Sequence, residues 1–522
     1  MNKKKQTNNL NPKGYKNMSR NTNTKQTKIS EIETTDNVIA SRGGLTFFLR
    51  YLENTRVYQL IEHHIGKIKG SRKGLSTREF LIQIMAFLMD GTNTSISYFD
   101  QLKSDDAHAS LLEISSDKLA SSHQIKRFFR RFMNKKIGRE IFREIIAELF
   151  IWRLKLEEPE YIILGIDTMV LDNDDAHQRE GVEPTYKRKK GFQPLHITWG
   201  AYLVDVIFRK GSAHSNHEDD FTESVKRIVE IIRSRYREDI PIIIVADSGF
   251  FDQKAFEYFE EVLKIHYVVT GKFYDYLWDT IKSLSKDRFK EYKGNGIWSY
   301  VEFGFRYKSW EKFRRVVFTS LVAEENGQRV LNFMGINSII ITNLGMDQEL
   351  TNRLESAGIG HFTEIEEIIR LSHERGRDEL VHRSLKEFAT KEQLPFKHFA
   401  MNESYYYFQV ITHIMFESYK RDVTADVIPV TSYPNTFRRR LIDFAVKIVK
   451  HSGKVTMKVR EIIMSTLRLK ELWERCQRPP VIQYLVEPEK VRFFLISSSL
   501  YYNFFRLLVR SNEFIKYFKQ NP

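Results

Sequence analysis

Two acidic residues stand where carboxylates can do chemistry. Asp167 ends the apolar run YIILGID, and Asp247 ends the run PIIIVAD. Short continuous apolar runs are typical of buried strands, and ligands gather at strand ends of an α/β sheet. Two carboxylates held together repel each other unless a cation lies between them, and oxygen-only ligands suit Mg²⁺ or Mn²⁺. The pair therefore indicates a metal site, although either residue alone would be explained as a strand-end cap.

A third acid lies in the stretch HERGRDELVHRSLKE, residues 373–387. On one continuous helix, with about 100° per residue, Glu379 and His382 share a polar stripe with Arg375 and Lys386. The apolar residues fall on roughly the other side: Leu380, Val381, Leu385 and Phe388. An ordinary surface helix with an Arg375–Glu379 pair would explain this pattern and would contribute only a few tenths of a kcal/mol. The two strand-end aspartates favour the alternative, in which Glu379 completes an acidic triad.

The elements that must position these acids alternate between strands and helices. A strand is predicted over 161–167, a strand pair with a tight turn near Gly200 over 193–211, a helix over 217–236, a strand over 241–247, a helix over 252–264 and a strand over 266–273. This order predicts a mixed α/β sheet flanked by helices. The aromatic, alternating texture of the next 60 or so residues predicts a β-rich insertion before the chain returns to the sheet.

Six segments follow from this reading. They are a disordered basic tail (1–35), a helical DNA-binding domain (36–155), the first part of the core (156–271), the β-rich insertion (272–336), the second part of the core with the Glu379 helix (337–422) and a basic, mostly helical C-terminal region with a possible role in dimerisation (423–522). Ser76 is a predicted helix N-cap, with Glu79 three residues later to form a capping box.

Composition narrows the classes of function. The chain has 522 residues, a formal net charge of +15 and a pI near 9.4, which favours a polyanionic partner, nucleic acid first. Its single cysteine, Cys476, excludes an internal disulfide framework and a cysteine zinc site. No phosphate-binding P-loop motif occurs. The polar N-terminus lacks a secretory apolar region, so a cytoplasmic protein is expected.

Basic residues cluster in two further places. A helix expected after Ser121 or Ser122 displays Lys126, Arg127 and Arg130, as a DNA-reading helix does. The stretch FRRRL includes Arg438 and Arg439. A solvated basic face explains either cluster equally simply, but the charge of the whole chain favours DNA contact.

The order of these motifs resembles that of the bacterial DDE transposases of insertion sequences. More narrowly, it resembles the branch with a Y-x2-R-x3-E-x6-K signature and a β-rich insertion before the glutamate. GIDT and ADSGF match the two aspartate motifs, and Arg375, Glu379 and Lys386 match the signature spacing. Ser372 stands where the family has its tyrosine. The resemblance covers roughly residues 30–460.

The resemblance implies an RNase H-like catalytic core in which Asp167, Asp247 and Glu379 hold two Mg²⁺ (or Mn²⁺) ions. It also implies that Arg375 and Lys386, with Arg383 beside them, contact DNA phosphates. In this branch an aromatic residue of the insertion often stacks on a flipped base, and Trp298 and Trp310 are the candidates, although a place in the core of the insertion explains each of them more simply.

The resulting functional hypothesis is a metal-dependent transposase that binds the terminal inverted repeats of its element. It would cut and rejoin double-stranded DNA as a homodimer on paired ends, near the bacterial nucleoid. The alternatives are a related nuclease that cleaves without joining, and a DNA-binding protein with a vestigial catalytic site.

Overall fold

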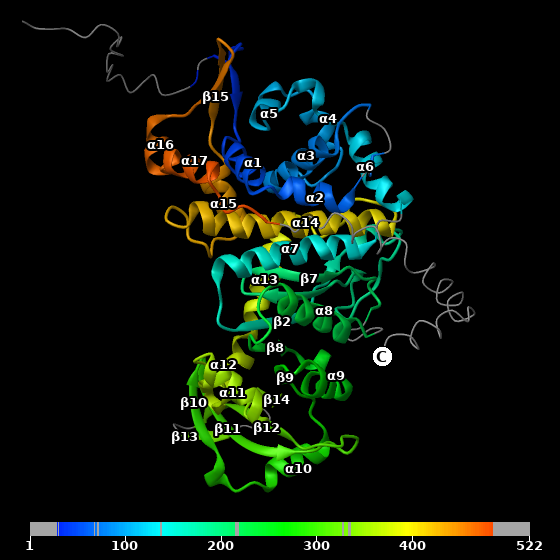
Figure 1. Ribbon diagram of the computed structural model, residues 1–522, viewed down its shortest axis with the longest axis vertical. Helices are drawn as coiled ribbons and strands as arrows, with labels where there is room; N and C mark the ends of the chain where they lie inside the picture. The colour runs from blue at the N-terminus through cyan, green and yellow to red at the C-terminus, as the bar shows by residue number, and fades with distance from the viewer. Residues whose placement is uncertain are drawn as a thin grey trace, which may run out of the picture.

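The computed structural model describes residue 29 and residues 31–66, 68–69, 73–135, 138–213, 219–325, 328–331 and 336–483. Its elements are stacked along one long axis (Figure 1). Elements from both ends of the described chain lie at one end of this axis, the long helices α7 and α14 lie across the middle, and the strands of the predicted insertion lie at the other end. Within the described residues, no helix is both long enough and apolar enough to cross a membrane.

The largest sheet among the described residues is mixed and has ten strands. Its strands run in the order β10 (Lys290–Gly294), β11 (Gly296–Phe305), β12 (Arg314–Glu325), β14 (Asn337–Thr342), β9 (His266–Thr270), β8 (Ile242–Ala246), β2 (Ile162–Thr168), β6 (Leu195–Trp199) and β7 (Tyr202–Ile207), with β13 (Gln328–Leu331) paired to β12. Strands β2, β8 and β9 are mutually parallel, and the other pairings are antiparallel. All five residues of β8 are buried, as in a strand covered on both faces.

A small second sheet lies beside β2. It contains β3 (Leu171–Asp172), β5 (Lys190–Phe192) and β4 (Glu183–Pro184) in that order. Gly191 allows β5 to approach β3 closely, because a Cβ atom at this position would lie 1.9 Å from the carbonyl oxygen of Leu171.

Seven helices precede the sheet. They are α1 (Gly44–Thr55), α2 (Val57–Ile65), α3 (Thr77–Asp90), α4 (Tyr98–Leu102), α5 (Asp106–Leu111), α6 (Ser122–Lys135) and α7 (Arg139–Glu157). The predicted capping box of α3 is confirmed: Ser76 accepts a hydrogen bond from the Glu79 amide, and the Glu79 side chain accepts one from the Ser76 amide. The remaining helices are α8 (Asp220–Arg235), α9 (Gln253–Tyr258), α10 (Asp275–Ser283), α11 (Gln348–Ser356), α12 (Ile365–His373), α13 (Arg377–Ala389), α14 (Phe399–Tyr419), α15 (Pro434–Phe437), α16 (Glu461–Thr466) and α17 (Leu469–Gln477).

Helix α14 is the centre of the core. Nearly all of its 21 residues are buried, and it packs against α1, α3, α6, α7, α13 and β7. An aromatic cluster forms part of this contact, because Phe408 of α14 lies against Phe128, Phe129 and Phe132 of α6. In Figure 1, α1, α2 and α3 lie on one side of α14, and α7 lies on its other side, next to β7.

The two ends of the described chain pack against each other. Strand β1 (Val38–Ala40) pairs with β15 (Val446–His451), which forms a hairpin with β16 (Lys454–Lys458). Helix α1 packs against α17, and the amide of Ile482 donates to the carbonyl of Thr55 at 3.0 Å. The segments 36–155 and 423–483 therefore share one layer.

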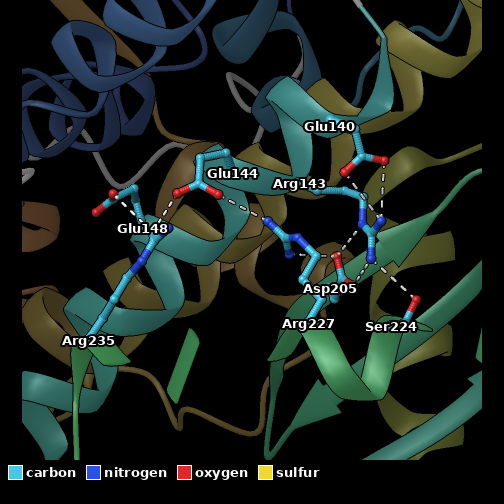
Figure 2. A network of polar contacts seen from close by, with 8 residues as sticks. All are labelled: Glu140, Arg143, Glu144, Glu148, Asp205, Ser224, Arg227 and Arg235. Carbon is cyan, nitrogen blue, oxygen red and sulfur yellow. Dashed lines mark hydrogen bonds and ion pairs between the residues drawn. The ribbon is translucent and has the colours of Figure 1, made fainter. Parts of the chain in front are cut away.

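A buried network of ion pairs joins α7, β7 and α8 (Figure 2). Asp205 of β7, whose side chain is 1% exposed, accepts hydrogen bonds from Arg143 at 2.9 and 2.5 Å. Arg227 of α8 lies 3.5 Å from Asp205 and 3.2 Å from Glu144, which also pairs with Arg235. This α7–α8 ion-pair network fixes two helices to the outer strand of the sheet.

The structure differs from the expectations in two places, and part of them lies outside the described residues. The strands of the 272–336 segment continue the main sheet through the β12–β14 pairing, and this segment also contains helix α10. The single helix expected over 373–387 is broken by a 3₁₀ turn at Glu374–Gly376. Most of the predicted basic tail and most of the last 60 residues lie outside the described residues.

Candidate active site

Asp167 and Asp247 lie side by side at the carboxyl ends of two inner strands, β2 and β8. Ile166 of β2 is in register with Ala246 of β8, and the two aspartates are the next residues of these parallel strands. Each carboxylate is oriented by a local backbone amide: Asp167 Oδ1 accepts from Thr168 at 2.7 Å and Asp247 Oδ1 accepts from Gly249 at 2.8 Å. Parallel pairing thus brings together two acids that are 80 positions apart in the sequence.

Glu379 is exposed near the start of α13. The buried face of α13 contains Val381, Leu385 and Phe388, as the helical spacing predicts. Leu380, however, is 52% exposed, although the spacing placed it on the apolar side. The expectation for His382 is also wrong, because this residue is 8% exposed and lies beneath the surface. The 3₁₀ turn before α13 removes Arg375 from that helix, so the four expected polar residues do not form one stripe.

Arg375, in the 3₁₀ turn, and His382, in α13, both lie near Asp167. Arg375 Nη1 lies 4.0 Å from Asp167 Oδ2, and His382 Nδ1 lies 3.8 Å from the same oxygen. Burial, together with the positive charges of Lys386, Lys187 and Arg375, lowers the pKa of His382 to about 4. His382 is therefore neutral at neutral pH, and Arg375 is a cation beside Asp167.

The other predicted phosphate contacts of α13 have partners within the chain. Lys386 Nζ lies 2.9 Å from Glu392 Oε2, and about a third of each side chain is exposed. Arg383 is 63% exposed at its side chain, pairs with Glu387 at 3.2 Å and stacks over the ring of Tyr433 at 4.2 Å. Both cations are held at the surface by contacts that are weak in solvent and can be exchanged for phosphate.

Tyr186 is a residue of the site that sequence reasoning missed. It lies in the turn between β4 and β5. Partial burial of the hydroxyl raises the pKa of Tyr186, and the charges of Asp167, Asp247 and Glu379 raise it further. All three carboxylates thus act electrostatically on the same phenol. The only signal in the sequence was an aromatic residue inside the basic run YKRKK.

The donor set is made of carboxylate oxygens, which is the type that Mg²⁺ and Mn²⁺ prefer. Among the residues that the structure describes, no three His, Cys, Asp or Glu side chains are gathered tightly enough to chelate a single ion. Asp167 and Asp247 are adjacent strand-end residues, whereas Glu379 comes from a separate helix. The carboxylate oxygens thus match the ligand type of a hard cation, and the sheet fixes two of the three carboxylates next to each other.

A cavity of about 500 Å³ lies beside α13. Arg375 and Leu380 line it from the active-site side, and Trp199, Lys420 and Tyr433 line it from other elements. Arg375 therefore contacts both this cavity and the surroundings of Asp167.

Some of the residues expected to bind DNA outside α13 are exposed, and others are buried. Lys126, Arg127 and Arg130 are exposed on α6, whose opposite face is buried in the aromatic cluster. Arg439 is exposed. Trp298 is half-buried, with its ring centre 4.4 Å from that of His373.

The expectation that Arg438 binds DNA is wrong. Its side chain is buried and donates to the carbonyls of Leu88, Met89, Glu387 and Phe388. These are carbonyls of the last turns of α3 and α13, which lack partners within their own helices. Arg438 thus ties the two helices together. In the insertion, Trp310 is 6% exposed and packs against Phe251 and Tyr307, as a core residue does.

A family model matches nearly the whole chain. The family described as transposase DDE domain group 1 matches residues 22–481. No curated protein matches the chain in sequence. A similar solved structure is titled a cryo-EM structure of the piggyBac transposase synaptic complex with hairpin DNA; it is 12% identical, the match covers 84% of this chain and 83% of that one, and the TM-score is 0.38. With the family matching residues 22–481, this chain belongs to the DDE transposases of domain group 1.

Proposed function

We propose that this chain is a metal-dependent DNA transposase that binds the terminal inverted repeats of a bacterial insertion sequence, cuts there and joins the cut ends to target DNA. One observation carries the proposal: Asp167 and Asp247 each follow a residue of the paired ends of the adjacent parallel strands β2 and β8, so the two carboxylates lie next to each other. Together with membership of the transposase family, this arrangement supports phosphodiester chemistry at this edge of the sheet.

The five strands β7, β6, β2, β8 and β9 would form the RNase H-like core. In support, the two aspartates occupy its central pair of parallel strands, and helices α7, α8 and α13 pack near it. The insertion strands extend this sheet on the β9 side through β14. The α7–α8 ion-pair network would keep the outer strand β7 in place while DNA is handled at the carboxyl ends of β2 and β8.

Asp167, Asp247 and Glu379 would hold Mg²⁺ or Mn²⁺, with two ions in the active state. When bound, such ions supply Lewis-acid stabilisation of a phosphate and activation of an attacking water or 3′-hydroxyl. The chain's own residues bind and orient the DNA. Arg375 would bind a phosphate beside Asp167, and the neutral His382 would support the Asp167 carboxylate without adding a competing charge.

The DNA path would extend from the active site over exposed cations. Lys386 and Arg383 would exchange their intramolecular pairs for backbone phosphates. Lys126, Arg127 and Arg130 of α6, and Arg439, would bind a more distant part of the duplex. Trp298 would contact a base near the cut. Two copies of the chain would pair the two ends of the element in the cytoplasm, at the nucleoid.

The decisive experiment is cleavage of a labelled duplex containing the inverted repeats that flank the gene. Wild-type protein and Asp167→Asn are compared with Mg²⁺, with Mn²⁺ and with EDTA. Metal-dependent nicking that is lost in the variant, while the variant still binds the duplex, supports the proposal. Transfer of a pre-cut end into plasmid separates a transposase from a nuclease that does not join. Binding without nicking by the wild type would contradict the proposal in favour of a vestigial DNA-binding protein.

A further inference from the structure

The strands β1, β15 and β16 form a separate sheet, which we call the terminal sheet, with β15 as its central strand. One face of this sheet packs on the core. Val446 and Ile448 of β15 are buried, and the two residues in register with Ile448, Val38 and Met457, are partly buried against the same core. Because side chains alternate between the two faces of a strand, the residues between these must point to the opposite face.

The opposite face of the terminal sheet is exposed and positively charged. It contains Lys447 of β15 and Lys454 and Lys458 of β16, and all three residues are exposed. We call these three residues and the surface between them the lysine face. The whole hairpin segment, residues 446–458, has four lysines and no Asp or Glu.

The hairpin that carries the lysine face is closed by a tight turn. Ser452 and Gly453 both have left-handed backbone conformations, with φ of 50° and 73°, as the favoured two-residue hairpin turns require. The strands remain paired up to His451 and Lys454, which flank this turn. In Figure 1 the hairpin lies at the extreme of one end of the long axis. The lysine face therefore belongs to a regular, fully paired β-ribbon at the surface of the molecule.

The arrangement of charge on this ribbon is unfavourable for the protein alone. Lys447 and Lys458 are direct cross-strand partners in the antiparallel register. The Cβ atoms of such partners are about 4.5–5.5 Å apart, and like charges at these positions destabilise a sheet. Among the described residues, no carboxylate forms an ion pair with any of the four lysines of the hairpin. A bound polyanion would remove this repulsion.

Protection of an exposed sheet edge explains only part of the lysine face. Lysines on an edge strand prevent pairing with another chain, and β16 is an edge strand. This argument covers Lys454 and Lys458. It does not cover Lys447, because β15 is paired on both sides and has no free edge.

Double-stranded DNA matches the lysine face in shape and in charge. The major groove admits a two-stranded β-ribbon, and lysines along a ribbon can pair with the phosphates that border the groove. The sequence that leads into β1 is also basic, since the first 30 residues include eight Lys or Arg and no acid. The terminal sheet thus joins two basic parts of the chain.

We propose that the lysine face binds the backbone of the element's end DNA at a position remote from the cut. Helices α7 and α14 lie between the terminal sheet and strands β2 and β8 in Figure 1, so the lysine face does not contact the scissile phosphate. This inference rests on the proposed function and adds to it a DNA-binding surface separate from α6, α13 and the acidic triad.

The first test measures how salt changes the affinity of the double variant Lys447→Gln/Lys458→Gln for the end duplex. Loss of two phosphate contacts should lower the slope of log affinity against log salt by about two units. The ratio of wild-type to variant affinity should therefore be roughly tenfold larger at about 50 mM than at about 200 mM salt. Cleavage at saturating DNA should keep its wild-type rate, because the reacting phosphate is elsewhere.

The matched control is Lys155→Gln/Lys226→Gln, which removes the same charge from α7 and α8. Lys155 is exposed, and Lys226 lies 3.9 Å from Glu223. This control should change the salt slope by less than about half a unit. Thermal unfolding of both double variants should match the wild type, since exposed lysines are replaced and the repulsion between Lys447 and Lys458 is removed.

A second test locates the contact on the DNA. An iron–EDTA group attached to Ser452→Cys should cleave the duplex away from the scissile phosphate; the natural thiol, Cys476, is buried. Shortening the duplex on the side away from the cut should abolish the difference between the wild type and Lys447→Gln/Lys458→Gln.

An unchanged salt slope in Lys447→Gln/Lys458→Gln, with a wild type that binds and cuts the repeats, would overturn the inference while the proposed function stands. Unchanged DNA binding together with an altered oligomeric state in ultracentrifugation would also overturn it, and would make the lysine face a contact between copies of the chain. A wild type that binds without cutting, with the slope still lowered in the double variant, would contradict the proposed function and support the inference.

Discussion

Two parts of this molecule use arginine and carboxylate in different ways. In the α7–α8 ion-pair network, Asp205 is almost completely buried and accepts two short hydrogen bonds from Arg143 (Figure 2). At the active site, Arg375 lies 4.0 Å from Asp167, and the two side chains keep 26% and 16% of their surfaces exposed. The first arrangement satisfies the acid within the fold, whereas the second leaves an acid that a ligand can reach.

The comparison shows that burial, rather than residue type, separates charges that stabilise from charges that act. A buried carboxylate that loses its cation must stay desolvated, so such pairs contribute strongly to stability when one partner is removed. A partly exposed carboxylate is resolvated when its partner leaves, so the loss of the partner costs the fold little. Arg438 and Arg439 repeat the same contrast at neighbouring positions.

The largest expected effect is on catalysis. Asp247→Asn should reduce DNA cleavage by roughly a hundredfold or more, because the variant loses a charged oxygen ligand at the reacting phosphate. Its free energy of unfolding in urea should stay within about 0.5 kcal/mol of wild type. A variant that is strongly destabilised would place Asp247 with the structural charges and would break the comparison.

Asp205→Asn should show the reverse pattern. The neutral amide leaves the buried Arg143 guanidinium without its carboxylate, which should lower the free energy of unfolding by about 3 kcal/mol. The cleavage rate of the folded fraction should not change. Urea denaturation followed by circular dichroism, with Asp167→Asn as the matched control, measures the difference. Equal stability of the two variants would contradict the assignment.

Arg438→Met should destabilise by about 2 kcal/mol, since carbonyls of the last turns of α3 and α13 lose a donor in a buried place. Arg439→Met is the control at the next position and should leave thermal unfolding unchanged. In filter binding, only Arg439→Met should weaken affinity for the end duplex, because only this variant removes an exposed positive charge. Weaker DNA binding by Arg438→Met with unchanged unfolding would reverse our reading.

A buried histidine should make stability depend on pH. Burial, together with the positive charges of Lys420 and Arg438, lowers the pKa of His413 to about 3. The unfolded chain takes up a proton below about pH 6.5, whereas the folded chain does so only near pH 3. The free energy of unfolding is therefore highest above pH 6.5 and is lost as the pH falls below that value.

Between pH 7 and pH 5, His413→Gln should thus lose about 2 kcal/mol less stability than wild type. Urea unfolding at both pH values measures this change in slope, independently of any constant cost of the substitution. His451→Gln, at an exposed position, serves as control and should keep the wild-type slope.

The smallest effect concerns the surface of α6. Arg130→Ala should reduce the slope of log affinity against log salt by about one unit for DNA binding, with unchanged stability. Glu113→Ala, at an exposed acid that pairs with Arg50, is a control for surface substitution and should not reduce the slope. An unchanged slope for Arg130→Ala would make the exposed face of α6 a solvated surface.

The sequence contained enough to find the two strand-end aspartates. Their strands are continuous apolar runs, so their ends could be placed within one residue at Asp167 and Asp247. It did not contain enough to place His382, because its burial depends on a long-range contact. The His382 ring packs against that of the buried His196 of β6, with ring centres 4.9 Å apart.

Arg438 and Tyr186 show a second limit. The sequence pattern of a run of arginines is the same whether the side chains are exposed to solvent or bind the carbonyls of two helices. The carbonyls that Arg438 binds are about 50 and 350 positions away in the sequence. Tyr186 lies in a short hairpin of a separate sheet, which has no periodicity to detect. Both placements depend on long-range packing, which local patterns do not encode.

The central position of α14 has a consequence for how the chain is made. The ribosome completes α1, α3, α6 and α7 well before residues 399–419, yet these helices bury their apolar faces against α14. Strand β1 must also wait for β15. The N-terminal helices therefore cannot finish folding during synthesis, and the growing chain exposes apolar surface until α14 emerges. The nascent polypeptide should depend on chaperones until then, and fragments that end before residue 399 should aggregate.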